Sequence, residues 1–121
     1  MAEKTAVVTG ASAGIGLYTA LGLARRGMRV VMGGRHSART EAARRLVAER
    51  VPVAGLAPAR ADFSALAEVR TLAAARLQRH PRLDLLVNNA GLIPARYALS
   101  AEGYELTVAV NHLAPVLLTN L

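Results

Sequence analysis

Residues 9–16 read Thr-Gly-Ala-Ser-Ala-Gly-Ile-Gly and lie between a short apolar run and a segment of helical period. The main-chain N–H groups of a glycine-rich turn can approach an anion closely, and the start of the following helix adds favourable electrostatics. A phosphate group is therefore the natural ligand of this turn. Gly10 would permit the tight turn, Gly14 the close approach of a pyrophosphate, and Gly16 the close packing of helix on strand. Ser12 would add a hydroxyl group to the site. The alternative for the whole segment is a plain strand-to-helix turn without a ligand.

Pro115 marks a second chemical feature near the end of the sequence. Proline has no N–H, so the main-chain carbonyl of Asn111, four residues earlier, loses its usual helical partner. We expect Asn111 at a kink with a free carbonyl, the alternative being a helix kinked only for packing. The neighbouring His112 is expected to be a packing or partly exposed residue. Nothing in the sequence has the spacing of metal ligands, so no metal is predicted.

Apolar, β-branched runs alternate with longer segments of helical period along the chain. This pattern predicts strands at 5–9, 29–32, 53–59 and 83–88, and helices at 15–26, 37–50 and 64–79. The strands are apolar without alternation, as is typical of a parallel sheet covered by helices on both faces. We therefore predict an α/β fold with a Rossmann-type doubly wound parallel sheet. The first strand would be central, with the second and third to one side and the fourth to the other.

Residues that typically bound helices support these segments. Gly27 is expected to end the first helix, Ser37 and Ser64 can cap the next two, and Pro81 follows the third.

A last helix is expected to run to residue 121. Ser100 would cap the start of this helix, and Glu102 and Glu105 would lie in its first turn. Its apolar face at residues 116–118 has no predicted cover, and the fourth strand would be a sheet edge. We therefore expect a marginal, aggregation-prone or oligomeric chain, with a homo-oligomer among its forms.

The composition narrows the classes of protein. The 121 residues make one domain, and the absence of cysteine together with a strand-like start favours a cytoplasmic protein without a signal peptide. No apolar stretch is long enough to span a bilayer, so no membrane partner is expected. The net charge of +7 comes from arginines spread along the chain, and aromatic residues are few. This pattern indicates solvated helix faces and no nucleic-acid partner.

Three motifs in this order resemble those of the short-chain dehydrogenases/reductases. They are Thr9-Gly10-x-x-x-Gly14-Ile15-Gly16, Asn88-Asn89-Ala90-Gly91 after the fourth strand, and Val110-Asn111-His112-Leu113 in the last helix. Gly34-Arg35 after the second strand and Asp62-Phe63-Ser64 after the third resemble more narrowly the retinol-dehydrogenase-like branch. The resemblance covers the whole chain, but the chain corresponds to only about the first half of such a family member. It is thus identified as the N-terminal portion of a dinucleotide-binding Rossmann domain, residues 1–121, ending within a helix, with an incomplete sheet of about four strands.

The resemblance implies a role for each matching residue. The residues that would hold the cofactor's pyrophosphate and adjoining ribose are Gly10, Ser12, Gly14, Ile15 and Gly16. Asp62 would accept a hydrogen bond from the adenine amino group, and Phe63 beside it would also bind the cofactor. Capping of the third helix is the alternative for Asp62. Main-chain groups of Asn89, Ala90 and Gly91 would line the nicotinamide-side ribose, while the Asn88 side chain is at least as well explained by tying neighbouring strands together.

Arg35 decides which dinucleotide we expect. An NAD site usually places an acid near the end of the second strand, where it binds the ribose hydroxyls. Here no acidic residue lies between Glu3 and Glu41, and Arg35 stands where that acid would be. A guanidinium can pair with a 2′-phosphate, so NADP(H) is favoured over NAD(H), with assistance from Arg39. A solvated arginine is the alternative.

The resemblance also implies a reaction, reversible hydride transfer between the nicotinamide and a small-molecule alcohol or carbonyl. The family's catalytic asparagine falls at Asn111, where it is thought to hold a water of a proton relay through its carbonyl. The family's tyrosine and the lysine four residues further on are absent, because the only lysine is Lys4. We expect these 121 residues to be inactive alone, so whether the chain is an enzyme stays open. Two hypotheses remain: the cofactor-binding half of an NADP(H)-dependent short-chain oxidoreductase, or a catalytically incompetent dinucleotide-binding module or remnant.

Overall fold

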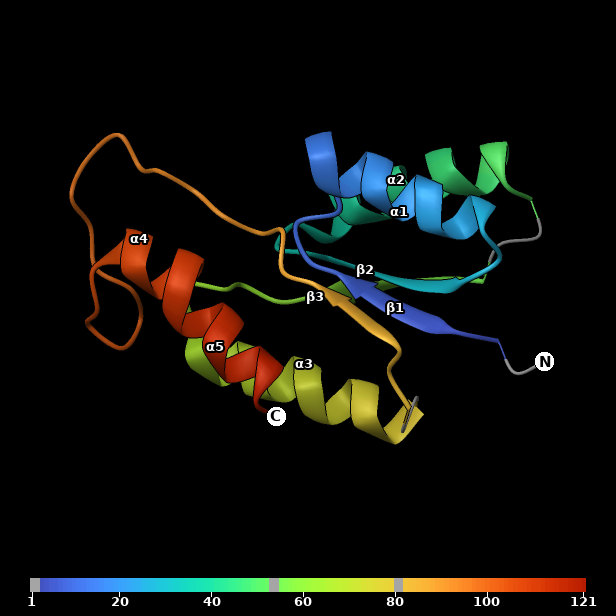
Figure 1. The fold of residues 1–121 in the computed structure, drawn as a ribbon. Coiled ribbons are helices and arrows are strands. Elements are labelled where there is room, and N and C mark those ends of the chain that lie inside the picture. The colour runs from blue at the N-terminus through green and yellow to red at the C-terminus, as the bar shows by residue number, and fades with distance from the viewer. Residues whose placement is uncertain (1–2, 53–54, 80–81) are drawn as a thin grey trace.

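A parallel sheet of four strands lies between two layers of helices in the computed structural model, which describes residues 3–52, 55–79 and 82–121 (Figure 1). The strands lie in the order β3-β2-β1-β4. Their bounds are β1 (Thr5–Val8), β2 (Arg29–Gly34), β3 (Leu56–Arg60) and β4 (Leu85–Val87). The helices between them are α1 (Gly14–Arg25), α2 (Ser37–Arg50) and α3 (Leu66–Arg79). The predicted fold class and strand order are confirmed.

The bounds of the two edge strands differ from those that the sequence pattern predicts. β3 begins at Leu56, and the expected start at residue 53 lies outside the described residues, as does Pro81. β4 has three residues where six were expected, and Leu85 is still 37% exposed. Pro58 in β3 pairs with Met32 of β2 alone, which an edge strand tolerates because its other side needs no N–H donor.

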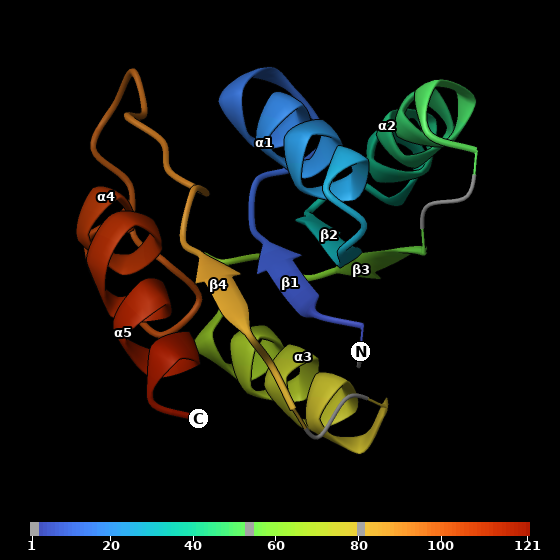
Figure 2. The same ribbon diagram turned by 45° about the vertical axis from the view of Figure 1, so that its right-hand side comes forward.

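Neighbouring residues of β1 point into two separate cores. Val8 packs with Met32 among residues of α1 and α2 on one face of the sheet. Val7 packs with Val31 on the other face, against α3 and the last helical segment. Figure 2 shows these two layers on opposite sides of the strands. β1 and residues 30–33 of β2 are buried on both faces of the sheet, which explains their continuous apolar sequence.

The helix ends confirm one expected boundary and correct another. Gly27 has a φ of +84°, and its N–H donates to the Ala24 carbonyl directly after α1, as predicted. Ser37 is the first residue of α2 and not its cap. His36 takes the cap position there without a side-chain hydrogen bond to the helix.

The last helical segment also begins later than expected. It consists of α4 (Leu106–Val108), the π-helix η1 (Ala109–Leu113) and α5 (Ala114–Thr119). Its cap is Glu105, whose carboxylate accepts the N–H groups of Thr107 at 2.9 Å and Val108 at 3.1 Å. The predicted cap, Ser100, instead accepts the Tyr104 N–H within the preceding turn.

Three further expectations are corrected. The carboxylate of Glu102 lies outside the last helix and accepts the N–H of Leu66, the first residue of α3. Ser64, which was expected to begin that helix, lies two residues before it. The face at residues 116–118 is partly covered, because Leu117 and Leu118 pack against the core beside α3.

Candidate functional site

A groove opens where the carboxyl ends of the strands meet, and it spans about 670 Å³ including the solvent at its mouth. Parallel sheets commonly bind ligands at this edge, where the strand order reverses. Among the residues expected at a cofactor, those that line the groove are Gly10, Ser12, Arg35, Asp62, Phe63, Ala90 and Gly91. The lining also includes Gly33, Gly34, Ala61, Leu92 and Val110. Gly14, Ile15, Gly16, Asn89 and Asn111 lie outside it.

The glycine turn needs its glycines for reasons visible in the structure. Gly10 has a φ of +63°, and a Cβ there would lie 2.9 Å from the Ala90 Cα. A Cβ on Gly16 would lie 2.2 Å from the Gly10 carbonyl oxygen, so α1 packs directly on the turn. Gly14, at φ +58°, begins α1 and faces open space. Ile15 is 80% exposed beside it.

Thr9 joins this turn to the loop after β4. Its hydroxyl accepts the N–H groups of Asn89 at 3.0 Å and Ala90 at 2.9 Å, and it is fully buried. The Asn89 amide nitrogen donates to the Gly10 carbonyl at 3.2 Å. Asn89 therefore contacts the turn through its side chain, while its main-chain N–H is bound by Thr9. The role of Thr9 was not predicted from the sequence, although a hydroxyl directly before a glycine turn is a usable signal.

Asn88 also has a partner other than the expected one. Its side-chain amide donates to the Thr119 hydroxyl at 3.1 Å. It thus ties β4 to α5 and not to a neighbouring strand.

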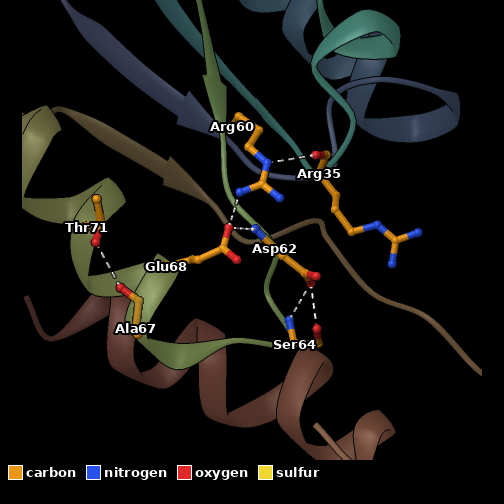
Figure 3. Close-up of polar contacts among 7 residues, drawn as sticks. All are labelled: Arg35, Arg60, Asp62, Ser64, Ala67, Glu68 and Thr71. Atoms are coloured by element: carbon orange, nitrogen blue, oxygen red, sulfur yellow. Dashed lines mark hydrogen bonds and ion pairs between the residues drawn. The ribbon is translucent and has the colours of Figure 1, made fainter. Parts of the chain in front are cut away.

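Arg35 and Asp62 follow β2 and β3, and both line the groove. Figure 3 shows the two residues and their polar neighbours. The Asp62 carboxylate accepts the Ser64 N–H at 2.9 Å and the Ser64 hydroxyl at 2.7 Å. Partial burial alone would raise the pKa of Asp62. The two bonds from Ser64 and the positive charges of Arg35 and Arg60 outweigh burial and hold this pKa below its ordinary value. Asp62 is therefore an ionised acceptor at neutral pH, and it also holds the turn that leads into α3.

Asn111 uses its side chain to hold the loop after β4. Its Oδ1 accepts the Leu92 N–H and its Nδ2 donates to the Leu92 carbonyl, both at 2.8 Å. A Cβ on Gly91 would lie 3.0 Å from the same Oδ1. The amide of Asn111 is thus occupied in fixing the wall of the groove.

The main chain around Asn111 differs from a regular α-helix. The Ala114 N–H donates to the carbonyl of Ala109, five residues earlier, and Pro115 has no N–H to give. The carbonyls of Val110 and Asn111 both lose the donor that an α-helix would provide. The sequence predicted this loss at Asn111 as a proline kink, and the structure places a π-helix there.

The chain matches the family model described as short chain dehydrogenase over residues 4–121. It belongs to the short-chain dehydrogenase family. Mouse (Mus musculus) retinol dehydrogenase 14 is 41% identical over 131 residues, an alignment that covers 100% of this chain and 39% of that protein. Human (Homo sapiens) dehydrogenase/reductase SDR family member 13 is 44% identical over 118 residues, covering 98% of this chain and 31% of that protein. The narrower likeness to retinol dehydrogenases is confirmed by such relatives, and the chain spans well under half of their length.

Solved short-chain dehydrogenases have the same fold. A metagenomic short-chain oxidoreductase in complex with NADP superimposes with a TM-score of 0.82 and 35% identity, over 97% of this chain and 53% of its own. A short-chain dehydrogenase from Sphingobium yanoikuyae in complex with NADPH superimposes with a TM-score of 0.80 and is 31% identical in sequence, over 97% of this chain and 46% of its own. Across the described part of this chain, no helix combines the length and the apolar character needed to cross a membrane.

Proposed function

We propose that the groove binds NADP(H) and that the chain forms the cofactor-binding half of an NADP(H)-dependent short-chain oxidoreductase. The observation that carries this proposal is the position of Arg35 on the groove wall, at the end of β2, with the glycine turn on the neighbouring strand. A cation at this place suits a 2′-phosphate, which a carboxylate would repel. The NADP and NADPH complexes among the structural relatives support the same choice.

Each part of the groove suits one part of the dinucleotide. The glycine turn and the first N–H groups of α1 would bind the pyrophosphate, with Ser12, Gly14 and Ile15 nearest to it. Asp62 and Phe63 would bind the adenine. Ala90, held by Thr9, and Gly91, next to the Leu92 that Asn111 holds, would line the nicotinamide-side ribose, with Asn89 supporting the turn.

The bound nicotinamide would supply hydride chemistry to a small-molecule alcohol or carbonyl. This chain contributes Asn111, whose main-chain carbonyl faces no α-helical donor and would hold a water of the proton relay. The three tyrosines, Tyr18, Tyr97 and Tyr104, have no lysine four residues further on. We therefore expect these 121 residues to bind the dinucleotide without catalysing a reaction. A dinucleotide-binding module would behave in the same way. A cytoplasmic location stays a prediction from composition.

Fluorescence titration of the chain with NADPH and with NADH tests the proposal. NADPH should bind more tightly, and Arg35→Ala should remove most of that preference. Arg79→Ala at the far end of α3 removes the same charge and should leave the preference unchanged. Tighter binding of NADH, or an unchanged preference in Arg35→Ala, would contradict the proposal.

A further inference from the structure

Arg60 and Glu68 form an ion pair beside Arg35 and Asp62, two residues that line the groove (Figure 3). Arg60 is the last residue of β3, and Glu68 lies in the first turn of α3. Their side chains are 52% and 36% exposed, so the attraction between them contributes little to folding stability. The same two side chains also form hydrogen bonds with the main chain of Arg35 and of Asp62, which line the groove.

The first of these bonds fixes Arg35. The Arg60 Nε donates to the Arg35 carbonyl oxygen at 3.2 Å. One residue away, the Ala61 N–H donates to the Gly34 carbonyl at 3.2 Å. The ends of β2 and β3 are thus joined at two successive places. The exposed guanidinium of Arg35 contacts the His36 Nε2 at 3.1 Å, while the main chain of Arg35 is held by Arg60.

The second bond fixes Asp62. The Glu68 Oε1 that pairs with Arg60 also accepts the Asp62 N–H at 3.1 Å. Figure 3 shows Glu68 between Arg60 and Asp62, outside the groove lining. A continuous path of contacts therefore runs from the Arg35 carbonyl through two side chains to the Asp62 N–H.

We propose that the Arg60–Glu68 pair positions Arg35 and Asp62 for the adenosine end of NADP(H). This inference rests on the proposed function, because it is Arg35 and Asp62 that would contact the 2′-phosphate and the adenine. Arg60 and Glu68 act through those residues and are positioning residues. Because the main chain of both residues is already held before the cofactor binds, binding loses less conformational entropy.

Charge and position give opposite expectations for Glu68→Ala. Removing a carboxylate near a site for a phosphate makes that site more positive, so electrostatics alone would tighten NADP⁺ binding. Loss of positioning would weaken it by roughly three- to tenfold, the cost of ordering one or two mobile groups on binding. We expect the weaker binding, together with a smaller preference for NADP⁺ over NAD⁺.

Three further variants complete the test, with isothermal titration of the full chain against NADP⁺ and NAD⁺. Glu68→Gln keeps an oxygen for the Asp62 N–H and should recover most of the preference. Arg60→Lys keeps the charge but loses the Nε donor to Arg35, so the preference should fall. Glu3→Ala breaks the pair with Arg29 at the other end of β2 with the same change of charge, and it should leave the preference unchanged.

Hydrogen exchange of the Asp62 amide in the cofactor-free chain gives a readout that does not require binding. Exchange should be faster in Glu68→Ala and unchanged in Glu3→Ala. The inference is overturned if the wild type prefers NADP⁺ through Arg35 while Glu68→Ala and Arg60→Lys keep that preference. A wild type without any preference for NADP⁺ overturns the proposed function itself, and the inference with it.

Discussion

The hydroxyl oxygen of Thr9 accepts the N–H of Ala90 at 2.9 Å, which joins the ends of β1 and β4 across 81 residues of sequence. The same oxygen accepts the Asn89 N–H and lies 3.4 Å from the Val87 carbonyl, to which the hydroxyl donates. One buried side chain therefore sets the distance between the glycine turn and the opposite wall of the groove. The geometry of the proposed pyrophosphate and ribose sites depends on it.

Thr9→Val tests that dependence, because it keeps the shape of the side chain and removes the acceptor. We expect the free energy of unfolding to fall by about 1–3 kcal/mol, the usual cost of leaving partly buried donors unsatisfied. NADPH affinity should fall with it. Urea denaturation and titration measure the two effects, and Thr9→Ser, which restores the hydroxyl, should recover both. Equal stability of the valine and wild-type chains would contradict the assignment.

Gly16 and Gly22 form a matched pair within α1. A Cβ on Gly16 would meet the Gly10 carbonyl oxygen at 2.2 Å, whereas a Cβ on Gly22 meets nothing within 4 Å. Gly22→Ala should stabilise the chain by about 0.5–1 kcal/mol through helix propensity. Gly16→Ala should destabilise it and weaken NADPH binding, because α1 must move away from the turn. Thermal unfolding of both variants checks the contrast; a stabilised Gly16→Ala would show that the turn yields without cost.

Asn111→Ala removes both hydrogen bonds to Leu92 and should loosen the loop after β4. Arg96 is exposed in that loop, so limited trypsin digestion should cleave there severalfold faster in the variant. Cleavage after the exposed Arg82, on the other side of β4, provides the internal control and should not change. Unaltered cleavage after Arg96 would mean that other contacts hold the loop.

Glu105 should make the stability of the chain depend on pH in the acid range. Its carboxylate accepts the Thr107 N–H and the Val108 N–H, and these bonds lower its pKa from the ordinary value of 4.5. The unfolded chain therefore takes up a proton first as the pH falls below about 4.5, and stability is lost as the pH passes through the lower pKa of the folded state. Denaturation at a series of pH values should show a shallower acid slope for Glu105→Gln than for the wild type. Identical slopes would exclude this contribution.

The sequence predicted the parts of the fold and site that depend on local chemistry. Gly10 and Gly27 need positive φ angles that few other residues adopt, so the turns they form could be located from residue type alone. The groove residue Arg35 directly follows β2, Asp62 lies two residues after β3, and strands of a parallel sheet end at a common edge. Their meeting in one groove therefore followed from the order of the elements.

The missed features depend on contacts between distant segments and, at Ser100, on a local turn. Glu102 caps α3 from a loop 36 residues further along the chain, a pairing that no local pattern encodes. Glu105 replaced Ser100 as a cap because the intervening residues form a turn held by the Ser100 hydroxyl. Arg60 and Glu68 looked like ordinary surface charges, and their link to Arg35 and Asp62 appears only once β2, β3 and α3 are assembled.

The π-helix at Ala109–Leu113 amounts to one extra residue inserted into an otherwise regular helix. Each residue turns an α-helix by about 100°, so a one-residue deletion here would rotate everything after it by roughly that angle. Leu117 and Leu118 would then leave the side of α5 that packs beside α3, and Thr119 would move away from Asn88. A length change of a single residue in this π-helix, where Val110 lines the groove and Asn111 holds its wall, would thus separate the helix from the sheet that it covers.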